Sequence, residues 1–247
     1  MGYVFDFKDA RAYEQWIAFN RIPVPLLYSL CLEMLQPKSG ESILDIGCGT
    51  GLGFPALLDA GLQVSGVDPS AYMLDIAQTR AGHRVDLHRG WAEDLPFADN
   101  AFHQACLITS LEFVQDPCKA LAEAARVAKN QLFIGWINRY ALKGAFLRIR
   151  GKFSPSAYNH AKLLSIWEVK RWIHQMLGDV PTDWRTLYLR PRSTARSGPQ
   201  KSGFSLLQHG PFGAIGVMRV MLVPRYRTTP LQLSYPVKPP TGVVPAA

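Results

Sequence analysis

Residues 44–53 read LDIGCGTGLG, in which a short apolar run ends abruptly at a glycine-rich stretch. The run 43–46 has the length and composition of a buried strand, and residues 54–60 have a helical pattern that Gly61 can end. The glycines therefore lie in a loop between a strand and a helix, where the backbone can approach a ligand closely. Loops of this kind bind nucleotides.

The alternation of short apolar runs and helical patterns continues as far as residue 138 and predicts an α/β fold. This fold is Rossmann-like, with a doubly wound and mostly parallel sheet. A Ser165 and Glu168 capping box predicts one further helix. We expect strands at 64–67, 85–88, 103–109, 132–137, 186–189 and 215–222, and helices at 70–80, 118–128 and 165–177. The stretch between the last two strands, rich in Arg, Ser, Gly and Pro, is expected to be a loop.

The bulk composition favours one domain with decorations. The chain has 247 residues, of which 48% are hydrophobic, enough to bury a full core. No apolar run approaches the roughly 18 to 20 residues that cross a bilayer. The first residues, with Asp6, Asp9 and Glu14, lack the pattern of a signal peptide. We therefore expect a cytoplasmic protein without a transmembrane segment.

The cysteines favour neither a disulfide framework nor a metal site. Cys31, Cys48, Cys106 and Cys118 include no C-x-x-C pair and have no histidine at metal-ligand spacing. We expect no metal.

The spacing of the glycines separates two classes of nucleotide. A dinucleotide fold requires G-x-G-x-x-G to seat a pyrophosphate, but Leu52 stands at the last of those positions. The pattern here is G-x-G-x-G, which suits a ligand without a pyrophosphate. An NAD-linked oxidoreductase is thereby disfavoured.

Three acidic residues follow one another at the places that a nucleoside with a cationic group would require. Asp45 comes just before the loop and can favour a cation. Asp68 ends the second strand, where a carboxylate can accept both hydroxyls of a ribose. After the third strand, Asp94 can accept from an exocyclic amine, with Leu95 and Phe97 as apolar contacts for a purine.

These segments together resemble a known family. LDIGCGTG, GVDPSAYMLDIA, AEDLPFADNAF and LEFVQDPCKALAEAARVAK resemble the successive motifs of class I S-adenosylmethionine-dependent methyltransferases. More narrowly, they are similar to the methyltransferase type 11 family, which includes ubiquinone and menaquinone methyltransferases. The resemblance covers roughly residues 41–137 and implies a seven-stranded sheet with the last strand antiparallel, S-adenosyl-L-methionine as cofactor, and methylation as the activity.

The resemblance also implies roles for individual residues. It places Asp45, Gly47 and Gly49 beside the methionine moiety, Asp68 at the ribose, and Ala92 with Asp94 at the adenine. Leu111 would lie near the methyl donor, and Tyr13 resembles an aromatic lid over the cofactor. The predicted cofactor-binding set is completed by the neighbouring residues Cys48, Gly51, Pro69 and Glu93.

The residues around the methyl acceptor are less well indicated. Phe113 replaces a histidine that is frequent in the family, so acceptor chemistry does not carry over from relatives. His160 and Tyr158, in the insert at about 138–164, are candidates for a general base, with a surface histidine on a lid helix as the alternative. The insert reads as a compact aromatic lid and favours a small-molecule or lipid-like acceptor, methylated by direct in-line displacement.

The charge of the chain leaves other partners open. Residues 1–137 hold 10 Lys/Arg and 16 Asp/Glu, whereas residues 138–247 hold 17 and 3, so the net charge is −6 in the first part and +14 in the second. The basic, amphipathic segment 139–152 could contact a membrane surface or close the active site as a cap. Nucleic acid is an alternative acceptor, and a non-catalytic S-adenosylmethionine-binding protein is another.

The predicted organisation has three parts. Residues 1–40 are expected to form an N-terminal helical cap, and residues 41–223 the methyltransferase domain with its lid insert. Residues 224–247 are rich in proline and lack periodicity, so we expect a disordered tail.

Overall fold

The computed structural model describes residues 2–5, 14–15, 24–140, 161–189, 204–208 and 210–222. Several predictions concern residues outside these ranges. They are those for Tyr13, Tyr158 and His160, for most of the lid insert and its basic segment, and for the C-terminal tail.

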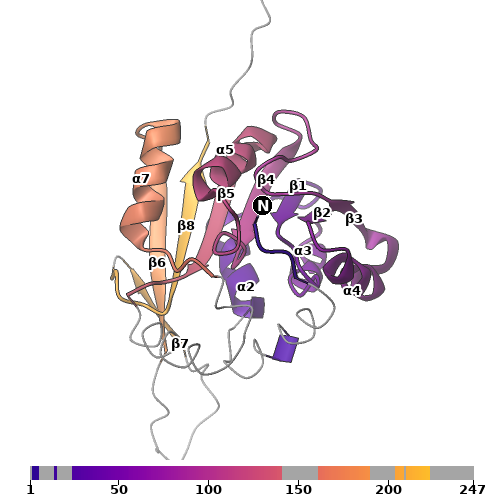
Figure 1. The fold of residues 1–247 in the computed structure, drawn as a ribbon, viewed down its shortest axis with the longest axis horizontal. Helices are drawn as coiled ribbons and strands as arrows, with labels where there is room; N and C mark the ends of the chain where they lie inside the picture. The colour runs from indigo at the N-terminus through magenta and orange to yellow at the C-terminus, as the bar shows by residue number, and fades with distance from the viewer. Residues whose placement is uncertain are drawn as a thin grey trace, which may run out of the picture.

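One mixed sheet of eight strands forms the centre of the molecule, in the order β3-β2-β1-β4-β5-β8-β6-β7 (Figure 1). The five strands from β3 to β5 run parallel, and β8, β6 and β7 follow as antiparallel neighbours. The doubly wound, mostly parallel fold with an antiparallel last strand is confirmed. The strands are Ser42–Ile46 (β1), Gln63–Asp68 (β2), Val85–Arg89 (β3), Phe102–Ile108 (β4), Ala128–Ile137 (β5), Thr182–Leu189 (β6), Phe204–Gln208 (β7) and Ile215–Met221 (β8).

The number of strands differs from the prediction because of β7. The sheet has eight strands rather than seven, because Phe204–Gln208, expected to be part of a loop, pairs with β6 as an antiparallel edge strand. This short run stands alone within a stretch of turn-forming residues, so its pairing with β6 is a tertiary preference that local sequence does not indicate.

Helices cover both faces of the sheet (Figure 1). On one face, Val24–Leu35 (α2), Phe54–Asp59 (α3) and Ala71–Ala81 (α4) share a core with the sheet, in which Phe54 and Leu57 are fully buried. On the other, Pro117–Val127 (α5) and Ile166–Leu177 (α7) share a second core around Trp136. Because both faces are buried, the central strands are almost continuously apolar.

The helix starts follow the predicted caps. The Ser70 side chain accepts from the Met73 amide, and Asp116 accepts from the first amides of α5. At α7, Ser165 and Glu168 form the predicted capping box. Each cap satisfies amides that a helix leaves unpaired at its first turn.

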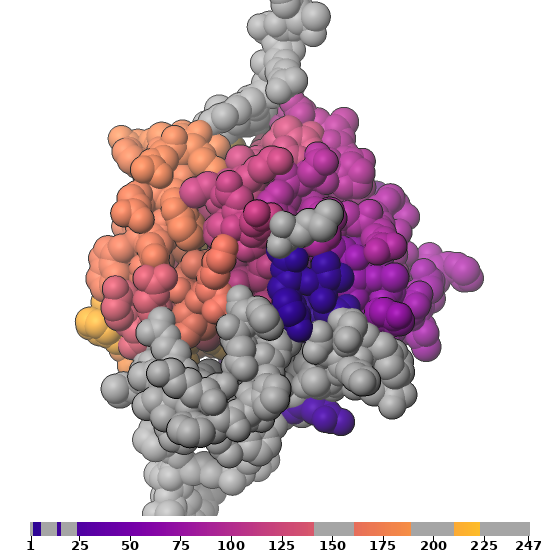
Figure 2. All heavy atoms as spheres, in the orientation of Figure 1, coloured from indigo at the N-terminus to yellow at the C-terminus, as the bar shows by residue number. Residues whose placement is uncertain are grey.

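The N-terminal segment 2–5 crosses the carboxyl edge of the parallel strands. The Tyr3 amide donates to the Phe113 carbonyl at 3.0 Å, and the Ser70 hydroxyl donates to the Phe5 carbonyl. The segment thus spans from the end of β4 to the end of β2. In Figure 2 it is the indigo surface between the magenta part of the chain and the pink and orange part.

Within the described ranges, no helix combines the length and the apolar character that crossing a bilayer would require.

Candidate functional site

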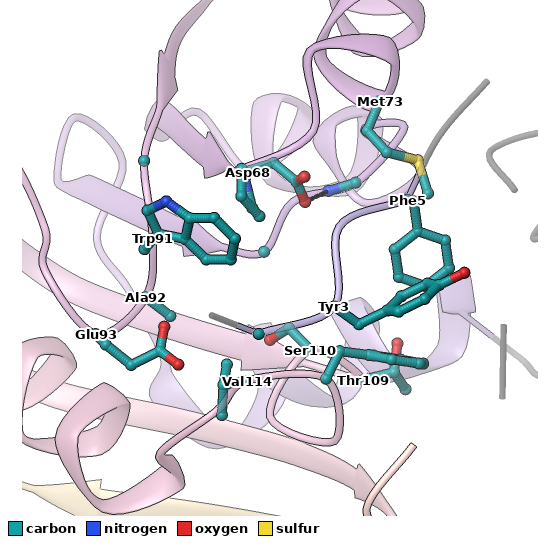
Figure 3. A pocket seen from close by; sticks show the side chains of 16 residues that line it. Tyr3, Phe5, Asp68, Met73, Trp91, Ala92, Glu93, Thr109, Ser110 and Val114 are labelled. Atoms are coloured by element: carbon teal, nitrogen blue, oxygen red, sulfur yellow. Dashed lines mark hydrogen bonds between the residues drawn. The ribbon is translucent and has the colours of Figure 1, made fainter. Parts of the chain in front are cut away.

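A pocket lies at the carboxyl ends of the parallel strands β1 to β4, beneath the N-terminal segment (Figure 3). This is the edge at which open α/β sheets bind ligands. Its empty space is about 620 Å³, part of which is open to solvent. The residues that line it are Gly2, Tyr3, Phe5, Gly47, Gly49, Asp68, Pro69, Met73, Gly90, Trp91, Ala92, Glu93, Thr109, Ser110, Phe113 and Val114.

The glycine loop forms the floor of the pocket in a conformation that excludes side chains. Gly47 and Gly49 have φ values of 71° and 54°, in the left-handed region. A Cβ atom at Gly47 would overlap the Cβ atom of Ser110. The backbone of β1 and the end of β4 therefore approach each other closely at this point.

The amides of the loop are already used within the protein. Gly47 and Cys48 both donate to the Val67 carbonyl, at 2.7 and 3.2 Å. Gly49 donates to the Asp68 carboxylate at 3.0 Å. A phosphate-binding loop instead presents free amides to its ligand. This loop is shaped for close approach but not for holding a phosphate.

The Asp68 carboxylate is hydrogen-bonded to the glycine loop. One of its oxygens accepts from Gly49, and the other accepts from the Ser70 amide at 2.9 Å. Burial raises the pKa of Asp68 to about 6, while these two hydrogen bonds act in the opposite direction. Each oxygen keeps a second lone pair, so the group can accept two further hydrogen bonds from a ligand.

Trp91 forms a wall of the pocket, beside Asp68 and above Ala92 (Figure 3). Gly90 allows the chain to pass close to its neighbours here, since a Cβ atom at this position would lie 3.1 Å from Val67 and 3.3 Å from Pro96. An indole and a methyl group side by side can contact a flat aromatic ligand.

The charged groups that line the pocket are both acidic. They are Asp68 and Glu93, and the described part of the chain contributes no lysine, arginine or histidine to the lining. Glu93 accepts from the amides of Gln115 and Asp116, at 2.7 and 3.3 Å, which fixes its carboxylate at the end of the pocket opposite Met73 (Figure 3). Such a pocket favours a cationic over an anionic ligand.

An aromatic cluster closes the pocket from the N-terminal side. The Phe5 ring packs edge-to-face against Phe113 at 5.0 Å and against Tyr3 at 5.1 Å. Met73 completes the contact and is 2% exposed (Figure 3). The segment 2–5 is thus fixed by side chains as well as by its two backbone contacts.

Comparison with known proteins places the chain in a family. The methyltransferase domain family matches residues 44–133. A demethylmenaquinone methyltransferase of Paenarthrobacter aurescens is 32% identical over 166 residues, which are 61% of this chain and 65% of the relative. An uncharacterized protein of Methanocaldococcus jannaschii is 35% identical over 178 residues, which are 70% of this chain and 80% of the relative. The chain belongs to the class I S-adenosylmethionine-dependent methyltransferases.

A solved methyltransferase structure supports this placement over most of the chain. A Thermotoga maritima protein, described as an S-adenosylmethionine-dependent methyltransferase and possible histamine N-methyltransferase, superposes with a TM-score of 0.70 at 25% identity. The match covers 87% of this chain and 97% of that one. By contrast, the chain spans 65% and 42% of the length of two demethylmenaquinone methyltransferases that it resembles.

The structure brings six of the predicted cofactor-binding residues to this pocket. They come from the ends of three strands and share one wall and the floor. They are Gly47, Gly49, Asp68, Pro69, Ala92 and Glu93. The predicted residues Asp45, Cys48, Gly51, Asp94 and Leu111 are not part of the lining.

Asp45 lies behind the glycine loop. It is fully buried and accepts from the Tyr28 hydroxyl at 2.7 Å and from the Cys106 thiol at 3.5 Å. Burial raises its pKa to about 6, while the two donors act to lower it. In this arrangement Asp45 connects α2, β1 and β4 beneath the floor.

Cys48, Gly51 and Leu111 are also turned away from the pocket. Cys48 is buried with its sulfur near Gly66, where a Cβ atom would lie 2.9 Å away. At Gly51, a Cβ atom would meet the Phe54 ring at 2.6 Å. Leu111 is fully buried in the core under α5 and α7.

Asp94 is exposed to solvent and does not line the pocket, but its backbone supports the turn that does. Its amide donates to the Trp91 carbonyl at 3.1 Å, which closes the turn that presents Trp91. The residues of this turn that line the pocket are therefore Trp91, Ala92 and Glu93, and not Asp94.

Sequence reasoning missed the N-terminal segment, Met73, Trp91 and the end of β4. Tyr3 and Phe5 alternate with other residues as in an extended strand, which is the one local signal for the segment. Thr109, with a φ of 53°, and Ser110 follow a strand whose end the sequence predicted. Their approach to Gly47 depends on tertiary packing.

Beside the pocket, Glu112 links the ends of β4 and β5. Its side chain is fully buried, and Oε1 accepts from the Ile137 amide at 2.6 Å. Its Oε2 atom has no hydrogen-bond partner among the described residues. Burial raises the pKa of Glu112 to about 7, partly offset by the Ile137 hydrogen bond.

Proposed function

We propose that this protein transfers a methyl group from S-adenosyl-L-methionine to a small organic or lipid-like acceptor. The observation that carries the proposal is the character of the pocket at the glycine loop. Its floor has the loop amides engaged internally, and its charged lining consists of two carboxylates, Asp68 and Glu93. A cationic nucleoside without phosphate groups suits such a pocket, whereas NAD does not.

Different residues of the pocket would bind different parts of the cofactor. Asp68, held by Gly49 and Ser70, would accept the ribose hydroxyls with its free lone pairs. Trp91 and Ala92 would contact the adenine, and the open space above Gly47 and Ser110 would take the methionine part. Bound there, the cofactor supplies an electrophilic methyl group on a sulfonium centre.

The protein would contribute positioning and exclusion of water. Segment 2–5, fixed by Phe113 and Ser70, covers the pocket, and its rings present apolar surface to the ligand. Aligning the acceptor with the methyl group in a closed site can provide a large part of the acceleration of a displacement reaction. An acceptor that is already nucleophilic needs no general base.

Two matches support a small acceptor. The Paenarthrobacter relative is named a demethylmenaquinone methyltransferase, and the Thermotoga structure is described as a possible histamine N-methyltransferase. The place of the family's frequent histidine is taken by Phe113, whose ring packs on Phe5. The chemistry at this position is therefore apolar contact rather than proton transfer.

Methyl transfer can be measured directly. The purified chain is incubated with methyl-labelled S-adenosylmethionine and fractions of a bacterial small-molecule and lipid extract, and S-adenosylhomocysteine is quantified. Labelled product in an organic-soluble fraction is the expected result. Cofactor binding without turnover on any fraction would contradict the enzymatic proposal, and label in added RNA or DNA would contradict the acceptor class.

A further inference from the structure

The outer face of α7 combines an exposed aromatic residue with basic residue types. Trp167 is 53% exposed, and Lys170, Arg171 and His174 follow at the spacing that places them on the same side of a helix. The opposite side of α7 is buried in the core under the sheet. In Figure 2 α7 lies open on the face that also shows the N-terminal segment over the pocket.

A second exposed aromatic residue adjoins Trp167. Tyr140 is 48% exposed, and its ring packs edge-to-face on the Trp167 indole at 5.4 Å. Phenol and indole rings have an apolar body and a polar atom, the combination that is enriched at membrane–water interfaces. We call these two residues with Lys170 and Arg171 the α7 surface.

The α7 surface is connected to the edge of the pocket by a short path of hydrogen bonds. The Arg139 amide, next to Tyr140, donates to the Leu164 carbonyl at 2.8 Å. Lys162 lies two residues before Leu164, and its amide donates to the Glu112 carbonyl at 2.8 Å. The Lys162 ammonium group donates to the Gln115 carbonyl. Residues 112–115 include two that line the pocket.

The surrounding sequence is strongly basic. Residues 139–171 contain eight Lys/Arg and a single acidic residue, Glu168, which is engaged with Arg139 at 3.0 Å. Within 141–160, the chain that joins Tyr140 to Ala161, there are four Lys/Arg and no Asp or Glu. Basic residues near an anionic membrane surface are attracted to it.

We propose that the α7 surface binds an anionic lipid bilayer and holds the pocket at the membrane. Tyr140 and Trp167 would enter the headgroup region, with Lys170 and Arg171 among the lipid phosphates. The proposal goes beyond methyl transfer and does not depend on it, because lipid binding needs neither cofactor nor turnover. It also gives a route by which an acceptor dissolved in lipid would reach the pocket.

Nucleic acid carries the same phosphate charge but fits the aromatic pair less well. Bases stack on open ring faces, whereas these rings pack edge against face and form one apolar projection. A projection flanked by cations suits insertion between headgroups.

Flotation of the full chain with vesicles tests the proposal. The vesicles contain phosphatidylcholine alone, or phosphatidylcholine and phosphatidylglycerol in equal parts, without any methyl donor. The test variants are Tyr140→Ala with Trp167→Ala, and Lys170→Glu with Arg171→Glu. The matched controls are Tyr72→Ala, another exposed aromatic residue on α4, and Lys38→Glu with Lys129→Glu, exposed cations before β1 and at the start of β5.

The expected result is binding to the vesicles that contain phosphatidylglycerol and weaker binding to phosphatidylcholine alone. Each test pair should lose at least about fivefold in the bound fraction at limiting lipid, which corresponds to about 1 kcal/mol, while the controls stay within twofold. Circular dichroism confirms that each variant is folded. Equal losses in test and control pairs would overturn the α7 surface as the site. Absence of vesicle binding by the wild-type chain, or binding of RNA in its place with the same residue dependence, would overturn the lipid partner.

Discussion

The Asp68 carboxylate accepts a hydrogen bond from the Gly49 amide at 3.0 Å, so the end of β2 is joined to the glycine loop after β1. The same carboxylate faces the pocket, where it can accept from a ligand. One side chain thus links the conformation of the loop to the occupancy of the site.

Replacing Asp68 by asparagine should weaken cofactor binding. The variant keeps the shape of the side chain but loses a charged acceptor, and hydrogen bonds to charged groups contribute roughly 1.5 to 3 kcal/mol each. We expect the dissociation constant for S-adenosylmethionine to rise at least about tenfold in titration calorimetry. Asp94→Asn is the matched control, because Asp94 is exposed outside the pocket, and it should remain within twofold of wild type. An equal loss in both variants would place the adenine contact at Asp94 after all.

Cofactor affinity should also depend on pH through Asp68. Its pKa of about 6 means that the carboxylate is ionised above this pH and protonated below it. Protonation removes acceptor capacity, so affinity should be constant above pH 7 and fall as the pH drops through 6. Fluorescence titrations between pH 5 and 8 measure the profile. The Asp68→Asn variant should lose this fall, and a profile unchanged by the substitution would assign the titration to another group.

A methyl group at Gly47 should disrupt the floor of the pocket. Gly47→Ala places a Cβ atom against Ser110 in a left-handed conformation, whereas Gly82→Ala has a similar φ of 62° but no neighbouring atom within 4 Å. The Gly82 variant should lose roughly 1 to 3 kcal/mol of stability and retain cofactor binding. The Gly47 variant should lose more stability and its cofactor affinity. Urea unfolding and calorimetry on both variants decide the matter, and normal binding by Gly47→Ala would refute the close approach to Ser110.

Glu112→Gln should stabilise the protein at alkaline pH. The pKa of Glu112 is raised from 4.5 in its ordinary state to about 7 in the fold, so the folded state holds the proton more tightly. Wild-type stability is therefore highest below pH 4.5 with respect to this group, and declines as the pH rises toward 7. The free energy of unfolding of the variant relative to wild type should grow by on the order of 3 kcal/mol between pH 4 and pH 8. Urea unfolding across this range measures the difference, and a constant difference would mean that Glu112 does not titrate in the folded protein.

Much of the fold could be predicted because its local signals agree with the tertiary structure. The strand before the glycines, the Ser70 and Asp116 caps and the Ser165 capping box all lie where their residue types indicate. The edge strand β7 could not, since its place is set by pairing with β6 rather than by its own sequence.

The site could be predicted as far as backbone motifs determine it. Gly47, Gly49, Asp68 and Ala92 follow from strand ends and turns, and they reach the pocket. Asp45 does not reach the pocket. The side chain of a buried strand residue points to one face of the sheet or the other, and the Asp45 side chain points toward Tyr28. The aromatic cover depends on a segment 40 residues or more before the loop, whose contacts with Phe113 no local pattern contains.

Titration calorimetry of the wild-type chain with S-adenosylmethionine and, separately, with NAD tests the central claim most directly. The pocket geometry predicts saturable binding of S-adenosylmethionine at one site per chain and no comparable binding of NAD, since the loop amides of Gly47, Cys48 and Gly49 are engaged. Tighter binding of NAD than of S-adenosylmethionine would contradict it.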